Sequence, residues 1–118
     1  MIIDSHLHIS TLDEKKKNLF EVKKELLESM QKFGINYSIV IPDNVPNPKC
    51  ADTETMFKII GDDKQFFSMG TINIFQDIEK QILDLESLIT AKKICAIKLF
   101  PGHDPFYPTD KKCQPVYD

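Results

Sequence analysis

The chain opens with the stretch Met1-Ile2-Ile3-Asp4-Ser5-His6-Leu7-His8-Ile9, which places two of its three histidines two residues apart. This apolar run predicts a β-strand, in which successive side chains point to opposite faces. The alternation puts Asp4, His6 and His8 on one face. Two neighbouring imidazoles held by a strand can bind one divalent transition metal such as Zn, Fe, Ni or Mn. The simpler interpretation is a solvated or hydrogen-bonded pair without a metal, and the rest of the chain decides between the two.

The composition is that of a soluble globular protein. A chain of 118 residues with 42% hydrophobic residues can bury the core of one domain. The net charge of -3 leaves no basic excess for binding a nucleic acid backbone. No apolar stretch reaches the roughly 20 residues that span a bilayer, and residues 1–12 lack the basic start of a signal peptide. Cys50, Cys95 and Cys113 are scattered and odd in number, which favours free thiols in a reducing compartment. We expect a cytoplasmic protein that binds a small-molecule substrate and neither nucleic acid nor membrane.

Strand-like and helix-like segments alternate along the chain. Four strands are expected at residues 2–9, 35–41, 66–74 and 94–100, and three helices at 13–33, 52–60 and 77–91. Ser10 and Thr11 can open the first helix, while Gly34 and Gly61 end the first two. Three prolines exclude regular structure from residues 42–48, and residues 101–115 are expected to form a polar loop. The alternation predicts an α/β domain of parallel strands joined by right-handed crossovers.

Polar side chains near the carboxyl ends of the strands decide between an open doubly wound sheet and part of a (β/α)8 barrel. They are His6 and His8 in the first strand, Thr71 and Asn73 in the third, and Lys98 in the fourth. Barrel active sites lie at this end of the strands. A complete barrel has about 250 residues, so residues 1–118 are expected to form its N-terminal half, with about four strands and without the C-terminal half.

The same residues carry a resemblance to a known family. Residues 1–8 resemble the opening strand of the amidohydrolase superfamily of metal-dependent barrel hydrolases. Asp43-Asn44-Val45-Pro46, Gly70-Thr71-Ile72-Asn73 and Ile97-Lys98-Leu99-Phe100-Pro101-Gly102-His103 resemble its amidohydrolase 2 branch. That branch includes barrel hydrolases, lactonases and non-oxidative decarboxylases of ring carboxylates. The resemblance implies that His6 and His8 are metal ligands and that the cofactor is a divalent metal, zinc first.

The resemblance also implies a mechanism and a missing half. In an intact member the metal activates a water for attack on a carbonyl or related centre. Members complete the site with histidines after the fifth and sixth strands and an aspartate after the eighth, which acts as ligand and general base. Catalytic zinc normally takes three protein ligands plus water. We therefore expect this chain to hold half of the machinery of a metal-dependent hydrolase and to be inactive alone.

Three further residues are candidates for the site. Lys98 falls where some superfamily members place a carboxylated lysine or a bridging glutamate, but one metal is more usual in this branch. We expect Lys98 to contact an anionic substrate group or to support the ligands, although metal ligation or a solvated ammonium would also fit its position. His103, in the following loop, is a second candidate for substrate contact. Asp4 could orient an imidazole or make an ordinary hydrogen bond at the strand start, and Cys50 and Cys113 are assigned to structure.

Several rival protein classes share parts of this pattern. TatD-type nucleases share the opening strand but place a glutamate at the end of the fourth strand, where this chain has Lys98. PHP-type phosphoesterases continue with further histidine and aspartate ligands close after the first pair, and none appears here. A non-oxidative decarboxylase of the same branch and a non-enzymatic α/β module both stay compatible with the residues. A half-barrel leaves sheet edges and an inner face uncovered, so we also expect self-association.

Overall fold

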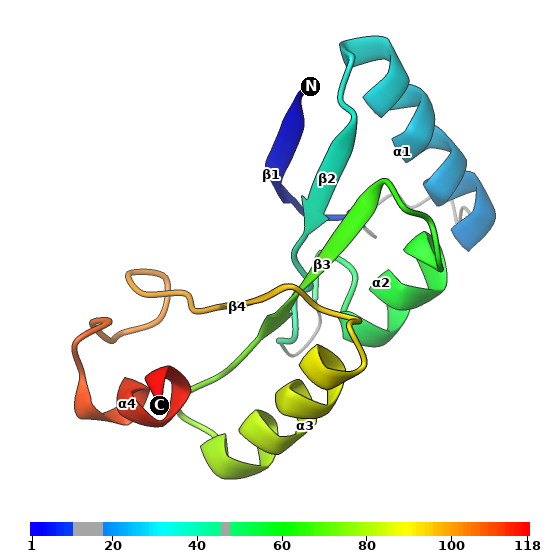
Figure 1. The fold of residues 1–118 in the computed structure, drawn as a ribbon. Coiled ribbons are helices and arrows are strands. Elements are labelled where there is room, and N and C mark those ends of the chain that lie inside the picture. Colours follow the sequence, from blue (N-terminus) through cyan, green and yellow to red (C-terminus); the bar gives the residue numbers. More distant parts are fainter. Residues whose placement is uncertain (11–17, 46–47) are drawn as a thin grey trace.

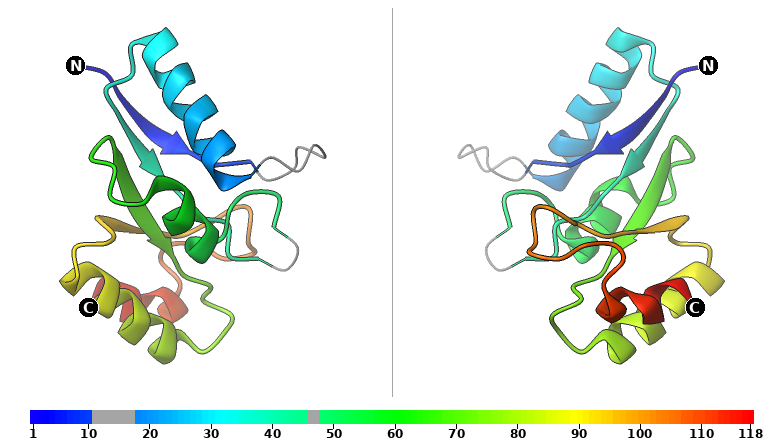
Figure 2. Two further views of the ribbon diagram at one scale, coloured as in Figure 1. Left: turned by 90° about the vertical axis from the view of Figure 1, so that its right-hand side faces the viewer. Right: turned by 90° about the vertical axis from the view of Figure 1, so that its left-hand side faces the viewer.

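The computed structural model describes residues 1–10, 18–45 and 48–118 of the chain (Figure 1). Its elements are β1 (Ile3–Leu7), α1 (Leu19–Phe33), β2 (Tyr37–Val40), α2 (Thr53–Ile60), β3 (Phe66–Thr71), α3 (Ile78–Thr90), β4 (Ala96–Lys98), the 3-10 turn η1 (Lys111–Cys113) and α4 (Gln114–Tyr117). The strands form one sheet in the order β1-β2-β3-β4, and every neighbouring pair is parallel. The sheet curls with the helices on its outer side (Figure 2). The prediction of four parallel strands in half of a (β/α)8 barrel is confirmed.

Local capping explains where the helices begin and end. Asn18 caps α1. Its side chain accepts a hydrogen bond from the Glu21 backbone N–H at 2.9 Å, and the Glu21 carboxylate accepts one from the Asn18 backbone N–H at 3.3 Å. Gly34 ends this helix with a φ of 69°, which a residue without a Cβ adopts easily. Asp52 and Asp77 cap α2 and α3. The helix expected over 13–33 therefore begins at Leu19 in the described chain, and residues 11–17, including the proposed start, lie outside the described residues.

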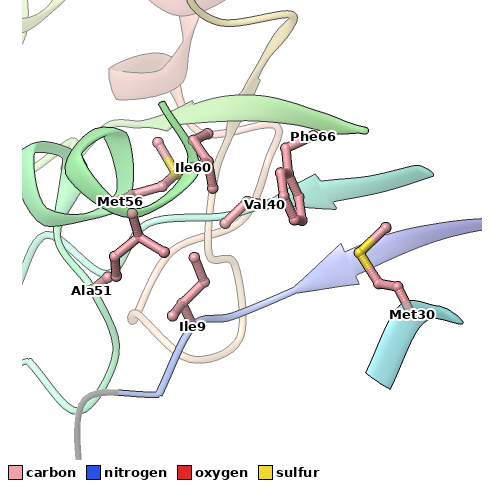
Figure 3. Packing of buried hydrophobic residues seen from close by; sticks show 8 residues of the cluster. Ile9, Met30, Val40, Ala51, Met56, Ile60 and Phe66 are labelled. Carbon is pink, nitrogen blue, oxygen red and sulfur yellow. The ribbon is translucent and has the colours of Figure 1, made fainter. Parts of the chain in front are cut away.

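The core lies between the sheet and its helices. Seven buried residues of its main cluster are labelled in Figure 3: Ile9, Met30, Val40, Ala51, Met56, Ile60 and Phe66. A second cluster of Ile72, Leu85 and Ile94 lies where α3 packs on the sheet. Burying such side chains stabilises the fold by about 1.5–3 kcal/mol each. The clusters fix which face of the sheet the helices cover, and we call the opposite face the concave face.

The prediction that residues 101–115 form only a loop is wrong at its end. Residues 111–117 form η1 and α4. Phe106 and Cys113 are buried together with Ile74, and the Tyr117 hydroxyl donates to the Pro108 carbonyl at 2.8 Å. Pro115 suits the first turn of a helix, where its missing N–H is not needed.

The register of β1 corrects a second prediction. Asp4 pairs with Ser38 and Leu7 pairs with Val40, with a register shift between the two pairs. Ser38 and Val40 both lie on the helix-covered face of β2, where each is 1% exposed. Asp4 and Leu7 therefore lie on the same face, although regular alternation would separate them. His6 and His8 lie on the concave face, and Asp4 does not share it with them.

The described strands are shorter than the strands predicted from the sequence. No helix in the described part of the chain is long and apolar enough to cross a membrane.

Candidate active site

His6 and His8 converge on one point. Their Nε2 atoms are 3.0 Å apart and their ring centroids 5.0 Å apart. Two nitrogen ligands on one zinc, each at 2.0–2.1 Å, are separated by about 2.9 Å at a right angle and about 3.3 Å at the tetrahedral angle. The two nitrogens make a hydrogen bond in this structure, and the same separation fits two adjacent positions of one metal ion. It supplies two ligands, and within the described residues no group of three His, Cys, Asp or Glu side chains could hold a metal.

The Asp4 carboxylate contacts the backbone of His6 rather than its imidazole. Its carboxylate accepts the backbone N–H of His6 at 3.1 Å. This is the ordinary hydrogen bond at the strand start, one of the two roles that the sequence allowed for Asp4. The Asp4 carboxylate thus stabilises the backbone conformation between Asp4 and His6. The buried Nδ1 of His8 has no hydrogen-bond partner in the described chain.

A pocket of about 580 Å³ opens at the carboxyl end of the sheet. It is lined by side chains at or after the ends of the four strands, among them His8, Asn44, Thr71, Asn73, Phe100 and His103, and by Gln81, Asp84, Leu85 and Leu88 of α3. The carboxyl ends of parallel strands meet at one mouth, so segments distant in sequence contribute to one pocket. Of the polar residues expected at the strand ends, His8, Thr71 and Asn73 line this pocket, whereas His6 and Lys98 are not among its lining residues; the loop residue His103 lines it as well.

Asn44 connects three elements at this mouth. Its Nδ2 donates to Thr53 Oγ1 at 2.8 Å and to Thr71 Oγ1 at 2.7 Å. Its Oδ1 accepts the Thr53 backbone N–H at 3.0 Å. The segment that follows β2 is thereby joined to the start of α2 and the end of β3. In the sequence Asn44 stood out only as part of a resembling motif, because nothing local predicts these contacts.

Lys98 lies at the carboxyl end of β4, in register with Thr71. Its Nζ is 5.7 Å from the centroid of the Phe100 ring, within range of a cation–π contact. Phe100 lines the pocket, whereas Lys98 is not among the pocket-lining residues. Lys98 thus lies next to the pocket wall.

His103 extends from the loop after β4 and is 81% exposed in its side chain. Its Nδ1 is 3.0 Å from the Asp104 carboxylate, and its ring meets Phe100 edge-on at 6.4 Å between centroids. When Nδ1 carries the proton, it donates a hydrogen bond to the Asp104 carboxylate, and Nε2 is left as a hydrogen-bond acceptor. Both His103 and Asp104 line the pocket, so an oriented imidazole stands at its rim.

Cys50 is a pocket residue to which the sequence gave only a structural role. It is half-buried and lines the pocket together with Asp43. Burial raises the pKa of the Cys50 thiol, and the negative charge of Asp43 raises it further. A thiol in such surroundings stays protonated and is a poor nucleophile.

Comparison with known proteins gives a fold. No family model and no curated protein matches the chain. It is similar to the crystal structure of a probable 2-pyrone-4,6-dicarboxylic acid hydrolase from Acinetobacter baumannii with citric acid bound, at 12% sequence identity and a TM-score of 0.56. The match covers 97% of this chain and 43% of that one, so the chain spans less than half the length of its structural neighbour. At this identity the similarity shows the half-barrel fold.

Proposed function

We propose that this chain provides two metal ligands and part of the substrate pocket of a hydrolase of the amidohydrolase type. The observation that carries the proposal is the 3.0 Å separation of the His6 and His8 Nε2 atoms beside a pocket at the mouth of a half-barrel. Both rings would bind through neutral Nε2, with their protons on Nδ1. His6 and His8 would hold a divalent ion, zinc first, and that ion would supply a bound water of lowered pKa as the nucleophile for a carbonyl.

The substrate we propose is a small molecule that carries a carboxylate beside the bond to be cleaved. Lys98 stands next to the pocket wall, where its ammonium can contact an anionic group, and His103 stands at the pocket rim. The structural neighbour supports this choice, since it is described as a probable hydrolase of a dicarboxylic acid and holds citric acid. Asn44 would keep the Thr71 hydroxyl at a fixed place in the pocket wall.

Zinc titration by calorimetry tests the ligand assignment. Two protein ligands give weak binding, so titration is more informative than metal content after purification. We expect zinc binding by the wild-type chain, its loss in His6→Ala and in His8→Ala, and its retention in His103→Ala, which removes the remaining histidine as a matched control. Unchanged zinc affinity in a His6→Ala/His8→Ala double variant would refute the assignment.

Citrate titration tests the role of Lys98. We expect Lys98→Ala to weaken citrate binding and to leave zinc affinity unchanged. Loss of zinc in this variant would instead make Lys98 a ligand. Unchanged affinities for both zinc and citrate would remove Lys98 from the proposed site.

A further inference from the structure

Asn44 fixes the direction of a hydroxyl group in the pocket wall. The Asn44 amide oxygen accepts the Thr53 backbone N–H at 3.0 Å. Because a backbone N–H can only donate, this contact determines which atom of the amide is oxygen and which is nitrogen. The amide nitrogen donates one hydrogen to Thr53 Oγ1 at 2.8 Å and the other to Thr71 Oγ1 at 2.7 Å. Both hydrogens of the amide are therefore used, and the Thr71 oxygen is the acceptor in its contact with Asn44.

The Thr71 hydroxyl keeps one proton to donate. A threonine hydroxyl carries one donor and two acceptor lone pairs. One lone pair faces Asn44, so the proton points elsewhere. In the part of the chain that the structure describes, no protein group accepts this proton. Thr71 is half-buried and lines the pocket, so its proton is available to an acceptor atom of a bound ligand.

Lys98 provides a second donor at the same level of the sheet. Thr71 and Lys98 are direct partners in the pairing of β3 with β4. Paired residues of neighbouring parallel strands point to the same face, and the strands lie about 4.8 Å apart. An ammonium group only donates, and among the described residues no carboxylate pairs with that of Lys98. A hydroxyl proton and an ammonium side by side suit the two oxygens of one carboxylate.

We propose that Thr71 and Lys98 form a carboxylate subsite, in which Thr71 donates its hydroxyl proton to the bound carboxylate and Asn44 sets the direction of that proton. This inference rests on the function proposed above and names the groups that select its substrate class. Asn44 is a positioning residue, because it acts on the ligand through Thr71. A protonated amine has no lone pair for the Thr71 proton and is repelled by Lys98, so the subsite favours carboxylates over amines.

Citrate titration of two variants tests the contribution of Thr71. Thr71→Val keeps the shape of the side chain and removes the hydroxyl, so we expect it to weaken citrate binding about tenfold, as for one hydrogen bond to a charged group. Thr71→Ser keeps the hydroxyl and should retain most of the wild-type affinity. Zinc affinity, which judges the histidine pair separately, should be unchanged in both. Wild-type citrate affinity in Thr71→Val, loss of its zinc affinity, or no citrate binding by the wild type each overturns the inference.

Asn44→Asp tests the direction of the proton. A carboxylate only accepts hydrogen bonds, so in this variant the Thr71 hydroxyl donates to residue 44 and turns its lone pairs to the ligand, while the contact with the Thr53 backbone N–H is kept. The added negative charge weakens citrate binding by itself, with or without the Thr71 hydroxyl, and a double-mutant cycle separates the two effects. We expect Asn44→Asp to reduce citrate affinity about tenfold more in the wild-type background than in Thr71→Val. An equal reduction in both backgrounds overturns the proposed direction of the proton.

Discussion

Gly70 allows a quantitative test of how α3 packs on the sheet. It lies in β3, and a Cβ at this position would overlap Leu85 Cδ2 and lie 2.9 Å from Ile94 Cδ1. Both contacted atoms are the ends of buried side chains, so Leu85 and Ile94 must shift within the core to admit the added methyl group. Overpacking a core by one methyl group costs about 1–3 kcal/mol. Replacing glycine returns about 0.4–1 kcal/mol by restricting the unfolded chain. We expect Gly70→Ala to lower the free energy of unfolding by about 1–2 kcal/mol.

The predicted effect is measurable by thermal unfolding followed by circular dichroism. For a chain of this length, 1 kcal/mol corresponds to about 4 °C in Tm, so Gly70→Ala should melt about 4–8 °C below the wild type at equal protein concentration. Leu85→Ala alone costs about 2–5 kcal/mol because it leaves a cavity. In that background the added methyl group has room, and the cost of Gly70→Ala should disappear. An unchanged Tm, or an equal cost of Gly70→Ala in both backgrounds, would show that steric overlap at Leu85 is not the cause.

Three further predictions concern the mouth and its neighbouring helix. Asn44→Ala removes an amide that makes several hydrogen bonds and should lower the unfolding free energy measured in urea by about 1–2 kcal/mol; wild-type stability would mean that the network is dispensable. Asp52→Ala should cost about 1 kcal/mol at neutral pH. The hydrogen bond from the Thr55 backbone N–H at the start of α2 lowers the pKa of Asp52. The stabilising charge of Asp52 is therefore fully present above the pKa of the unfolded chain, about 4, and is lost as the pH falls through the lower pKa of the folded chain. The difference between this variant and the wild type should therefore shrink in acid, and a constant difference would contradict the charge effect. Cys50 should react with iodoacetamide more slowly than the exposed Cys95 at a pH of about 8, as followed by peptide mass spectrometry. Asp43→Asn should reduce the difference between the two reaction rates. An unchanged difference would exclude the charge of Asp43 as a cause.

Features fixed by neighbouring residues could be predicted from the sequence. The ends of the helices depend on caps such as Gly34 and Asp52, which act within one turn. The alternation of strands and helices likewise follows from local hydrophobic spacing. The gathering of polar side chains at one mouth was predictable because parallel strands present the same end to it.

Features fixed by contacts between distant segments could not be predicted. Asn44 contacts Thr71 across 27 positions of the chain. The short helices near the C-terminus depend on the burial of Phe106 and Cys113 against Ile74 from another part of the chain. No local sequence pattern predicts these contacts. The surroundings of Cys50 could not be predicted for the same reason, because they too depend on other segments of the chain.

The register shift in β1 shows how a small local departure from regularity creates the candidate site. Asp4 lies on the helix-covered face because it pairs with Ser38. If strict alternation continued from Asp4, His6 and His8 would also face the helices, in place of the apolar side chains that fill the core there. The shift moves Leu7 and Ile9 toward the core and turns both imidazoles to the concave face. The carboxylate of Asp4 satisfies the His6 N–H within the shifted segment, so a buried core and a converging histidine pair are compatible in one short strand only because its alternation is broken once.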